Sequence, residues 1–300
     1  MQNITVIGSG TMGNGIAHTF AQFGYKVSIV DLKQEFLDKA IATITKNIDR
    51  QISKGSIIES DKQNTLKNIS TFIKLEEGVK NADLVVEAAT ENSELKLNIF
   101  KQLDSICKPE AILSSNTSSI SITKIASATK RADKVIGMHF MNPVPLMKLV
   151  EVIRGKETSD AVTKTIMELS GKLNKIPVEV NDAPGFVANR ILMPMINEAI
   201  YALHEGVAGV EEIDTVMKLG MAHPMGPLQL ADFIGLDVCL SIMKVLHEGF
   251  NSSKYNPCPL LVTMVREENL GVKSGSGFYK YSAGSKEVIV ADRFKRVVSR

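Results

Sequence analysis

The stretch Asn3–Asp31 constrains the fold of this chain more than any other part of the sequence. It reads as an apolar strand, the turn Gly8–Gly13 with the pattern G-x-G-x-x-G, a helix that Gly24 ends, and a second apolar strand that ends on Asp31. Alone, such a glycine pattern is a weak signal. Because it lies between a strand and a helix, and because an acidic residue closes the second strand, it predicts a βαβ unit that binds a dinucleotide.

Each glycine of this turn has its own physical task. Gly8 permits the tight turn, Gly10 lets the backbone approach a pyrophosphate, and Gly13 lets the helix pack closely on the strand. The N-terminus of the helix then favours the anion. The predicted cofactor-binding residues of the turn are Gly8, Ser9, Gly10, Thr11, Met12 and Gly13.

Asp31 bears on which dinucleotide is bound. Its carboxylate can accept hydrogen bonds from ribose hydroxyls and would repel a 2′-phosphate, so the sequence predicts NAD rather than NADP. The alternative at this point is a glycine-rich turn in some other α/β fold.

The composition is that of a globular protein without a strongly charged partner. The 300 residues suffice for one large domain or two of ordinary size, with 44% hydrophobic and 23% charged residues. A net charge of +2 gives no reason to expect nucleic-acid binding. Cys107, Cys239 and Cys258 are far apart, which supports neither a disulfide framework nor a metal site. No targeting segment and no apolar run of membrane-spanning length is found, so a cytoplasmic protein is expected.

The pattern of elements changes part-way along the chain. Further apolar strands are predicted up to residue 180, and after Asp182 only helical patterns remain. The predicted helices are Val187–Glu205, Val210–Leu219, Pro227–Phe250 and Pro259–Glu268. They are apolar on more than one face, which suggests burial in an oligomer interface as well as in a core.

These elements define the predicted fold class. It is an α/β N-terminal domain of the doubly wound Rossmann type over residues 1–182, with a helical hairpin at about 34–68. An all-helical domain follows over residues 183–281. No role is assigned to the tail, residues 282–300.

The run between Val135 and Ile153 predicts a strand, a loop and a second strand. His139 falls at the end of the first strand and Glu151 lies inside the second. If the two strands are neighbours, the imidazole and the carboxylate can meet and form a general base with a fixed tautomer. The alternative is a structural histidine. Asn142, beside a proline in the loop, either faces the cofactor or only shapes the turn.

Two other predicted strand ends carry polar side chains. Glu91 follows the strand Asp83–Ala88, where it could lie near the nicotinamide ribose or could be a first-turn acid of the next helix. Lys96 could reach the same edge of the sheet or could be exposed. Ser118 and Ser119 belong to the polar run after the next strand. The favoured interpretation is that one of them caps the following helix, and the alternative is a binding site.

The remaining candidates are basic or amide side chains. Lys46, Arg50 and Lys54 share one face of a long helix, which is favoured as a solvated face over a cationic rim for a polyanionic substrate. Asn189 lies in the first turn of the first C-terminal helix, where it could reach a cleft or cap the helix. Lys273, in a glycine-rich loop, could meet a phosphate or be ordinary surface.

Six motifs in order resemble those of one family. They are V-I-G-S-G-T-M-G, D-L-V-V-E-A, S-N-T-S-S, G-M-H-F-M-N-P-V-P-x-M-K-L-V-E-V, D-x-P-G-F-x-x-N-R and G-x-K-x-G-x-G-F-Y. Together they are similar to the short-chain L-3-hydroxyacyl-CoA dehydrogenase family, which includes bacterial 3-hydroxybutyryl-CoA dehydrogenases. The resemblance covers about residues 1–281.

The resemblance implies roles for individual residues. His139 would be the catalytic base and Glu151 its partner, while Ser118 and Asn189 would contact the 3-oxygen of the substrate. The ADP half of NAD would be held by the residues of the glycine turn and by Asp31. The nicotinamide half would be contacted by Glu91, Lys96, Ser118 and Asn142. The coenzyme A portion would lie near Lys54 and Lys273.

The resemblance also implies an activity. The chain would be an enzyme of fatty-acid and butanoate metabolism that reversibly oxidises a 3-hydroxyacyl-CoA, with 3-hydroxybutyryl-CoA as the expected substrate and NAD as cofactor. Its helical domain would bind substrate and form the dimer. One alternative is an NAD-dependent dehydrogenase of a free hydroxy acid or sugar acid. Another is a non-catalytic NAD-binding regulatory or structural protein, which would have no need of Ser118, His139, Glu151 and Asn189 together.

Overall fold

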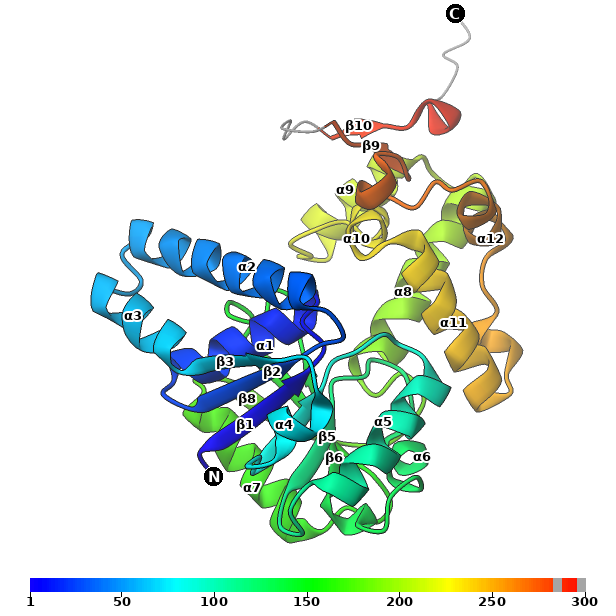
Figure 1. Ribbon diagram of the computed structural model, residues 1–300. Helices are drawn as coiled ribbons and strands as arrows, with labels where there is room; N and C mark the ends of the chain where they lie inside the picture. The colour runs from blue at the N-terminus through cyan, green and yellow to red at the C-terminus, as the bar shows by residue number, and fades with distance from the viewer. Residues whose placement is uncertain (283–287, 296–300) are drawn as a thin grey trace, which may run out of the picture. The chain divides into compact units, whose positions relative to one another are not determined.

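The computed structural model describes residues 1–282 and 288–295, and the chain divides into two compact units, Met1–Phe186 and Val187–Arg300 (Figure 1). The first unit contains a sheet of eight strands covered by helices, and the second is built mainly of helices.

The sheet of the first unit has the strand order β3-β2-β1-β4-β5-β6-β7-β8. Its strands are β1 (Asn3–Ile7), β2 (Lys26–Val30), β3 (Ile69–Phe72), β4 (Leu84–Glu87), β5 (Ile112–Ser115), β6 (Val135–Phe140), β7 (Leu149–Arg154) and β8 (Ile176–Asn181). Strands β1–β6 run parallel, β7 is antiparallel to β6, and β8 is parallel to β7. The chain reverses its direction of winding between β1 and β4, so the predicted doubly wound fold is confirmed.

Helices cover both faces of this sheet. They are α1 (Thr11–Gln22), α2 (Gln34–Ser53), α3 (Glu59–Lys67), α4 (Leu75–Val79), α5 (Ser93–Ile106), α6 (Ile122–Ala126) and α7 (Asp160–Lys172), with a short 3₁₀ turn η1 (Ala132–Lys134). Alternate residues of one strand serve the two faces: Val86 packs in the core with α1, α2 and α7, whereas Val85 packs in the core with α4, α5 and α6. Burial on both faces explains why the strands read as continuous apolar runs. The predicted hairpin is α2 and α3.

The start of α6 differs from the prediction. The cap is Ser121, whose hydroxyl accepts a hydrogen bond from Lys124 N (3.1 Å), and Asp182 adds acceptors for the backbone N–H groups of Ile122 and Thr123. The prediction that Ser118 or Ser119 caps this helix is therefore wrong. Those serines lie before the helix and are engaged elsewhere.

The second unit contains α8 (Ala188–His204), α9 (Val210–Gly220), α10 (Pro227–Ile234), α11 (Leu236–Phe250) and α12 (Pro259–Arg266). Short 3₁₀ turns lie at η2 (Ser253–Tyr255), η3 (Val272–Ser274) and η4 (Asp292–Phe294). The single helix predicted over residues 227–250 is two helices, because Gly235 between them has φ of 103° and ends the first. The expectation of helices alone also missed a small antiparallel pair, β9 (Tyr279–Lys280) and β10 (Ile289–Val290).

Two buried aspartates explain the glycine-rich motif near the end of this unit. Asp214 accepts a hydrogen bond from Tyr279 OH (2.7 Å), and Asp232 accepts them from Tyr279 N (2.9 Å) and Tyr281 OH (3.0 Å). A Cβ at Gly277 would lie 1.9 Å from Asp232 Oδ1, so only glycine fits there. Desolvation raises the pKa of Asp232 to about 6, although its hydrogen bonds act in the opposite direction.

Part of the tail belongs to the second unit. Ala291 is buried and its N–H donates to Phe278 O (3.0 Å), while the Phe294 ring lies 5.7 Å from the Phe278 ring. The other tail residues, 283–287 and 296–300, lie outside the described residues.

A buried histidine of α1 gives a stability prediction. His18 is fully buried, and neither ring nitrogen has a hydrogen-bond partner among the described residues. Burial lowers the pKa of the imidazole from 6.5 to about 4. A base with a lowered folded-state pKa contributes stability that is present above pH 6.5 and is lost as the pH falls toward 4.

We therefore expect wild type to lose about 3 kcal/mol more unfolding free energy than His18→Leu between pH 7 and pH 4. Urea titrations at a series of pH values measure this difference. The control is His204→Leu, at an exposed position in the last turn of α8. Parallel pH curves for wild type and His18→Leu would contradict the assignment.

Candidate active site

His139 and Glu151 form a buried pair between β6 and β7. The antiparallel register places the two residues directly opposite each other, and His139 Nδ1 lies 2.7 Å from Glu151 Oε2. His139 is 8% exposed and Glu151 is 2% exposed. An Nδ1–H group that donates to the carboxylate leaves Nε2 as the basic nitrogen of the ring. The predicted contact between imidazole and carboxylate is thus confirmed.

The ring of Phe186 packs near this imidazole, with the ring centroids 6.0 Å apart. The loop that follows β6 is held by Lys175, whose ammonium donates to the backbone carbonyls of Val144 and Met147. The end of β6 is therefore fixed by packing and by hydrogen bonds, which orients the histidine.

The glycine turn has the geometry that a pyrophosphate site requires. Gly8 has φ of 90°, and a Cβ at Gly13 would lie 1.8 Å from Gly8 O. A Cβ at Gly10, by contrast, would have no heavy atom within 4 Å, so the backbone there is open to a ligand. The side chain of Met12 packs against the core.

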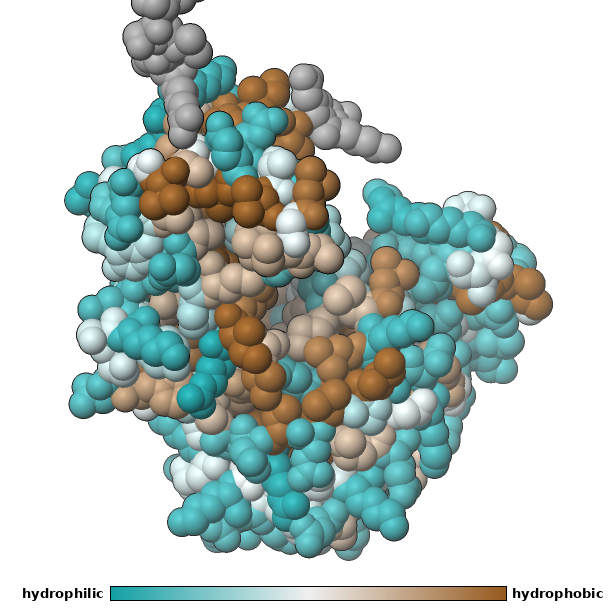
Figure 2. Space-filling view, turned by 180° about the vertical axis from the view of Figure 1, so that it is seen from behind, coloured by the Kyte–Doolittle hydropathy of each residue, from teal (hydrophilic) through white to brown (hydrophobic). Residues whose placement is uncertain are grey.

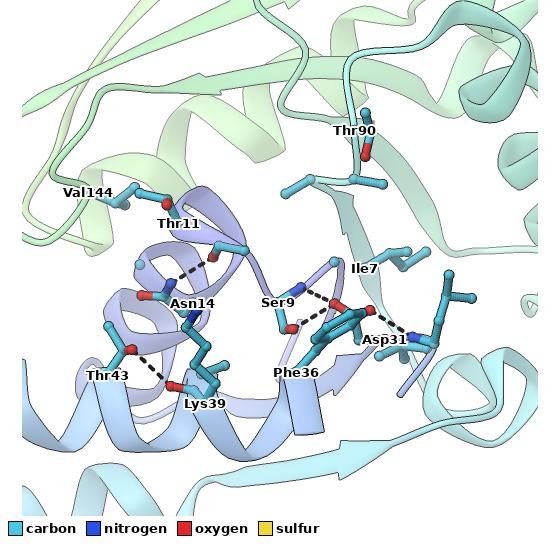
Figure 3. Close-up of a pocket in the computed structure, with 18 of the residues that line it drawn as sticks. Ile7, Ser9, Thr11, Asn14, Asp31, Phe36, Lys39, Thr43, Thr90 and Val144 are labelled. Atoms are coloured by element: carbon cyan, nitrogen blue, oxygen red, sulfur yellow. Dashed lines mark hydrogen bonds between the residues drawn. The ribbon is translucent and has the colours of Figure 1, made fainter. Parts of the chain in front are cut away.

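A cavity of about 810 Å³ opens beside this turn (Figure 3). It is lined by residues that follow the carboxyl ends of β1, β2, β4 and β6, which is where doubly wound sheets bind nucleotides. The site residues on its wall are Gly8, Ser9, Gly10, Thr11, Asp31 and Asn142. The open turn and the position of the acidic residue fit a dinucleotide such as NAD.

Asp31 faces the glycine turn. Its Oδ2 accepts hydrogen bonds from Ser9 N (2.7 Å) and Ser9 Oγ (2.6 Å), and its Oδ1 accepts one from Leu32 N (2.7 Å) (Figure 3). The carboxylate therefore lies at the cavity wall, where ribose hydroxyls could exchange with these donors.

Glu91 accepts hydrogen bonds from the polar residues that follow β5. Its Oε1 accepts hydrogen bonds from Thr117 Oγ1 (2.5 Å), Ser118 N (2.9 Å) and Ser119 N (3.1 Å). Burial alone would raise the pKa of Glu91, but the Lys96 ammonium and these donors lower it below its ordinary value. Glu91 precedes Asn92, the cap of α5, so its interpretation as a first-turn acid is wrong.

Lys96 is buried, and the alternative that it is exposed is wrong. Only 1% of the residue is exposed, and its Nζ lies 2.7 Å from Glu87 Oε1 and 3.4 Å from Glu91 Oε2. Glu87 was not predicted as a site residue. The signal was an acid inside the apolar run D-L-V-V-E-A, because a carboxylate in a strand buried on both faces needs a charged partner.

The polar run is also connected to the histidine strand. Asn116 Oδ1 accepts a hydrogen bond from Phe140 N (2.9 Å), the residue after His139. The half-buried Ser118 therefore belongs to a loop that is tied both to Glu91 and to the end of β6.

Lys54 is the remaining candidate of the first unit. It follows the last residue of α2, and Lys46, Arg50 and Lys54 are all exposed.

The last two candidates belong to the second unit. Asn189 is 9% exposed and is the second residue of α8, whose N-cap is Val187. Lys273 lies in η3, and its Nζ is 2.5 Å from Asp237 Oδ1.

Comparison with known proteins identifies the family. Residues 3–183 match the family described as 3-hydroxyacyl-CoA dehydrogenase, NAD binding domain, and residues 185–281 match the C-terminal domain of 3-hydroxyacyl-CoA dehydrogenase. The chain belongs to the 3-hydroxyacyl-CoA dehydrogenase family. Membership decides against a glycine-rich turn of an unrelated α/β fold, and it makes the chain an NAD-dependent oxidoreductase.

Individual members of the 3-hydroxyacyl-CoA dehydrogenase family are similar along nearly their whole length. The probable 3-hydroxybutyryl-CoA dehydrogenase of Bacillus subtilis is 54% identical over 94% of this chain and 98% of its own. The mitochondrial hydroxyacyl-coenzyme A dehydrogenase of Sus scrofa is 41% identical over 94% of this chain and 91% of its own. The crystal structure of (S)-3-hydroxybutyryl-CoA dehydrogenase from Ralstonia eutropha has a TM-score of 0.91 at 50% identity and covers 94% of this chain and 99% of its own.

None of the helices within residues 1–282 and 288–295 combines the length and the apolar character of a membrane-spanning helix.

Proposed function

We propose that this dehydrogenase oxidises 3-hydroxybutyryl-CoA to the 3-ketoacyl-CoA in a reversible, NAD-dependent reaction. The observation that carries this proposal is the buried His139–Glu151 pair (2.7 Å) at the end of a strand whose following loop lines the dinucleotide cavity. The names of the relatives supply the substrate, since three relatives at 52–54% identity are named as 3-hydroxybutyryl-CoA dehydrogenases or probable ones.

The pair gives the reaction its acid and base. In the oxidation, His139 Nε2 takes the proton of the 3-hydroxyl group, and Glu151 stabilises the imidazolium that forms. In the reduction, the same nitrogen returns the proton to the 3-oxygen. NAD, when bound, accepts the hydride from C3 of the substrate.

Other residues hold the reactants. Ser118 donates a hydrogen bond to the 3-oxygen, and Asn189 helps to position that atom. The turn Gly8–Gly13 and Asp31 would hold the ADP half of NAD. The nicotinamide half would be contacted by Glu91, Lys96, Ser118 and Asn142. Positioning of the two bound reactants contributes to the rate in addition to the acid and base.

Lys54 and Lys273 are proposed to attract the phosphates of coenzyme A. The same experiment tests this recognition and the activity as a whole. NADH oxidation is followed with acetoacetyl-CoA, with acetoacetyl-pantetheine, which lacks the nucleotide phosphates, and with free acetoacetate.

We expect rapid turnover of the first substrate, a raised KM for the second, and little activity with the third. Comparable kcat/KM for acetoacetyl-CoA and free acetoacetate would favour a free hydroxy acid as the true substrate. Absence of turnover with all three would favour a non-catalytic protein. Equal KM values for the first two substrates would remove both lysines from phosphate recognition.

Asp31 is proposed to select NAD over NADP. For Asp31→Ala we expect about tenfold weaker NADH binding and a smaller preference over NADPH, because a charge-assisted contact to the ribose and the repulsion of a 2′-phosphate are both lost. Fluorescence titrations with the two cofactors measure this. Asp38→Ala, at an exposed position of α2, is the control. An unchanged cofactor preference in Asp31→Ala would remove that role.

The protein is proposed to be cytoplasmic.

The second unit is proposed to form a homodimer. Figure 2 shows apolar side chains gathered on the surface of this unit. Its exposed large apolar residues include Ile191, Val216, Leu219, Met221 and Phe233. Single exposed apolar residues are ordinary, but a group of this size on one small unit is typical of an interface.

Light scattering after gel filtration should therefore give about twice the chain mass of 32.7 kDa. Leu219→Asp should shift the mass toward the monomer, whereas Ile58→Asp, at an exposed position of the first unit, should not. A monomeric wild type would rule out the dimer.

A further inference from the structure

A buried ion pair lies at the carboxyl end of β4 and has no part in the proton transfer. Glu87, the last residue of β4, is fully buried, and Lys96 in α5 is 1% exposed. The Lys96 ammonium donates to both carboxylate oxygens, at 2.7 and 2.9 Å. Such a pair stabilises a fold little more than well-packed apolar side chains would, because both charges lose their hydration. Stability alone is therefore a weak reason for its presence.

The carboxylate of Glu87 is fully engaged by the surrounding loops. Ala89 N donates to Oε1 (2.7 Å), and Ser115 Oγ, at the end of β5, donates to Oε2 (2.6 Å). Ser115 Oγ in turn accepts a hydrogen bond from Thr117 N (3.2 Å). The pair is thus connected to the start of the polar run that contains Ser118.

The ammonium of Lys96 is engaged in the same way. Besides Glu87, it donates to Ala89 O (3.3 Å) and lies 3.4 Å from Glu91 Oε2. A lysine has three N–H donors, and these acceptors are sufficient for all of them. The side chain is therefore directed toward protein groups.

Glu91 connects Lys96 to the polar residues that follow β5. While its Oε2 lies against Lys96, its Oε1 accepts hydrogen bonds from Thr117 Oγ1, Ser118 N and Ser119 Oγ. The contacts form a closed ring that runs from Glu87 through Lys96 and Glu91 to Thr117, and back through Ser115 to Glu87. Ser118 is attached to this ring by its backbone N–H (2.9 Å) and its hydroxyl (3.3 Å), both of which donate to Glu91 Oε1.

We propose that Glu87 and Lys96 are positioning residues of the dehydrogenase reaction, which hold Glu91 and thereby place Ser118 against the 3-oxygen of the substrate. This inference rests on the proposed role of Ser118.

The test separates positioning from folding by removing the two charges singly and together. Glu87→Gln leaves a buried ammonium with less compensation, so its melting temperature should fall. The double variant Glu87→Gln/Lys96→Met has no uncompensated charge at this place, and its melting temperature should return toward the wild-type value. Its kcat with acetoacetyl-CoA should nevertheless stay about 10- to 100-fold below wild type, because Glu91 has lost its anchor. KM for acetoacetyl-CoA should change less than threefold.

A matched control lies on the same helix. Asp104 of α5 pairs with Arg131 Nε (2.8 Å) and accepts a hydrogen bond from Lys130 N (2.9 Å). Asp104→Asn should lower the melting temperature and leave kcat unchanged. If the double variant recovers kcat together with its melting temperature, the pair is merely structural and the inference is overturned.

A second comparison asks whether the effect passes through Ser118. Ser118→Ala should lower kcat, and adding Glu87→Gln/Lys96→Met to it should lower kcat less than twofold further. A full additional loss would show that the pair acts elsewhere and would overturn the inference. If Ser118→Ala itself turns over normally, the proposed role of Ser118 fails. If Ser118→Ala is slow while the double variant is fast, only the present inference fails.

Discussion

His139→Gln should lose most of its turnover and keep its affinity for NADH. The substitution retains a polar side chain of similar length but removes the nitrogen that takes the proton of the 3-hydroxyl group. Loss of a positioned acid and base typically lowers the rate by about a hundred- to ten-thousand-fold. The cavity that receives the dinucleotide is lined by other residues, so its affinity should stay within a few-fold.

Steady-state rates with acetoacetyl-CoA and NADH fluorescence titrations measure both quantities. His204→Gln, at an exposed position of α8, should behave as wild type in both. A kcat near the wild-type value in His139→Gln would show that another group transfers the proton.

Glu151→Gln should have the second largest effect. In the structure the carboxylate lies 2.7 Å from His139 Nδ1, where it can only accept a hydrogen bond while it is ionised. A glutamine amide can donate to Nδ1 instead, which stabilises the tautomer that carries its proton on Nε2 and cannot act as a base. The imidazolium formed during oxidation also loses its counter-charge. We expect kcat to fall about a hundred-fold or more.

A control variant separates the specific role of the Glu151 carboxylate from the general effect of losing a negative charge. Glu179→Gln, an exposed residue on the neighbouring strand β8, removes a carboxylate that touches Arg154 and lies away from the pair. It should leave kcat unchanged. If Glu151→Gln turned over as fast as Glu179→Gln, the carboxylate would have no part in catalysis.

The parts of the fold that could be predicted depend on local chemistry. The turn from Gly8 to Gly13 specifies its own backbone conformation, since any Cβ at Gly13 would collide with Gly8 O. The continuous apolar runs indicated strands buried on both faces. To predict the contact between His139 and Glu151, the register of the two strands was also needed, because a shift of one residue would turn the carboxylate to the other face of the sheet.

The parts that could not be predicted depend on contacts between distant residues. The acid inside the run D-L-V-V-E-A signals that Glu87 needs a charged partner, but which lysine supplies the charge depends on how the start of α5 lies against the end of β4. The cap of α6 was misplaced because Asp182 and Ser121 come together at its start, and Ser118 is held by Glu91 instead. The break at Gly235 was missed because apolar periodicity continues across it, although its φ of 103° ends the helix.

The most direct test is a crystal structure of the enzyme with NAD and acetoacetyl-CoA bound. The account predicts His139 Nε2 within about 2.6–3.2 Å of the 3-oxygen, with Nδ1 still on Glu151 and the nicotinamide ring facing C3 of the acyl group. An imidazole turned away from the 3-oxygen, or a different side chain within hydrogen-bonding distance of that atom in its place, would contradict it.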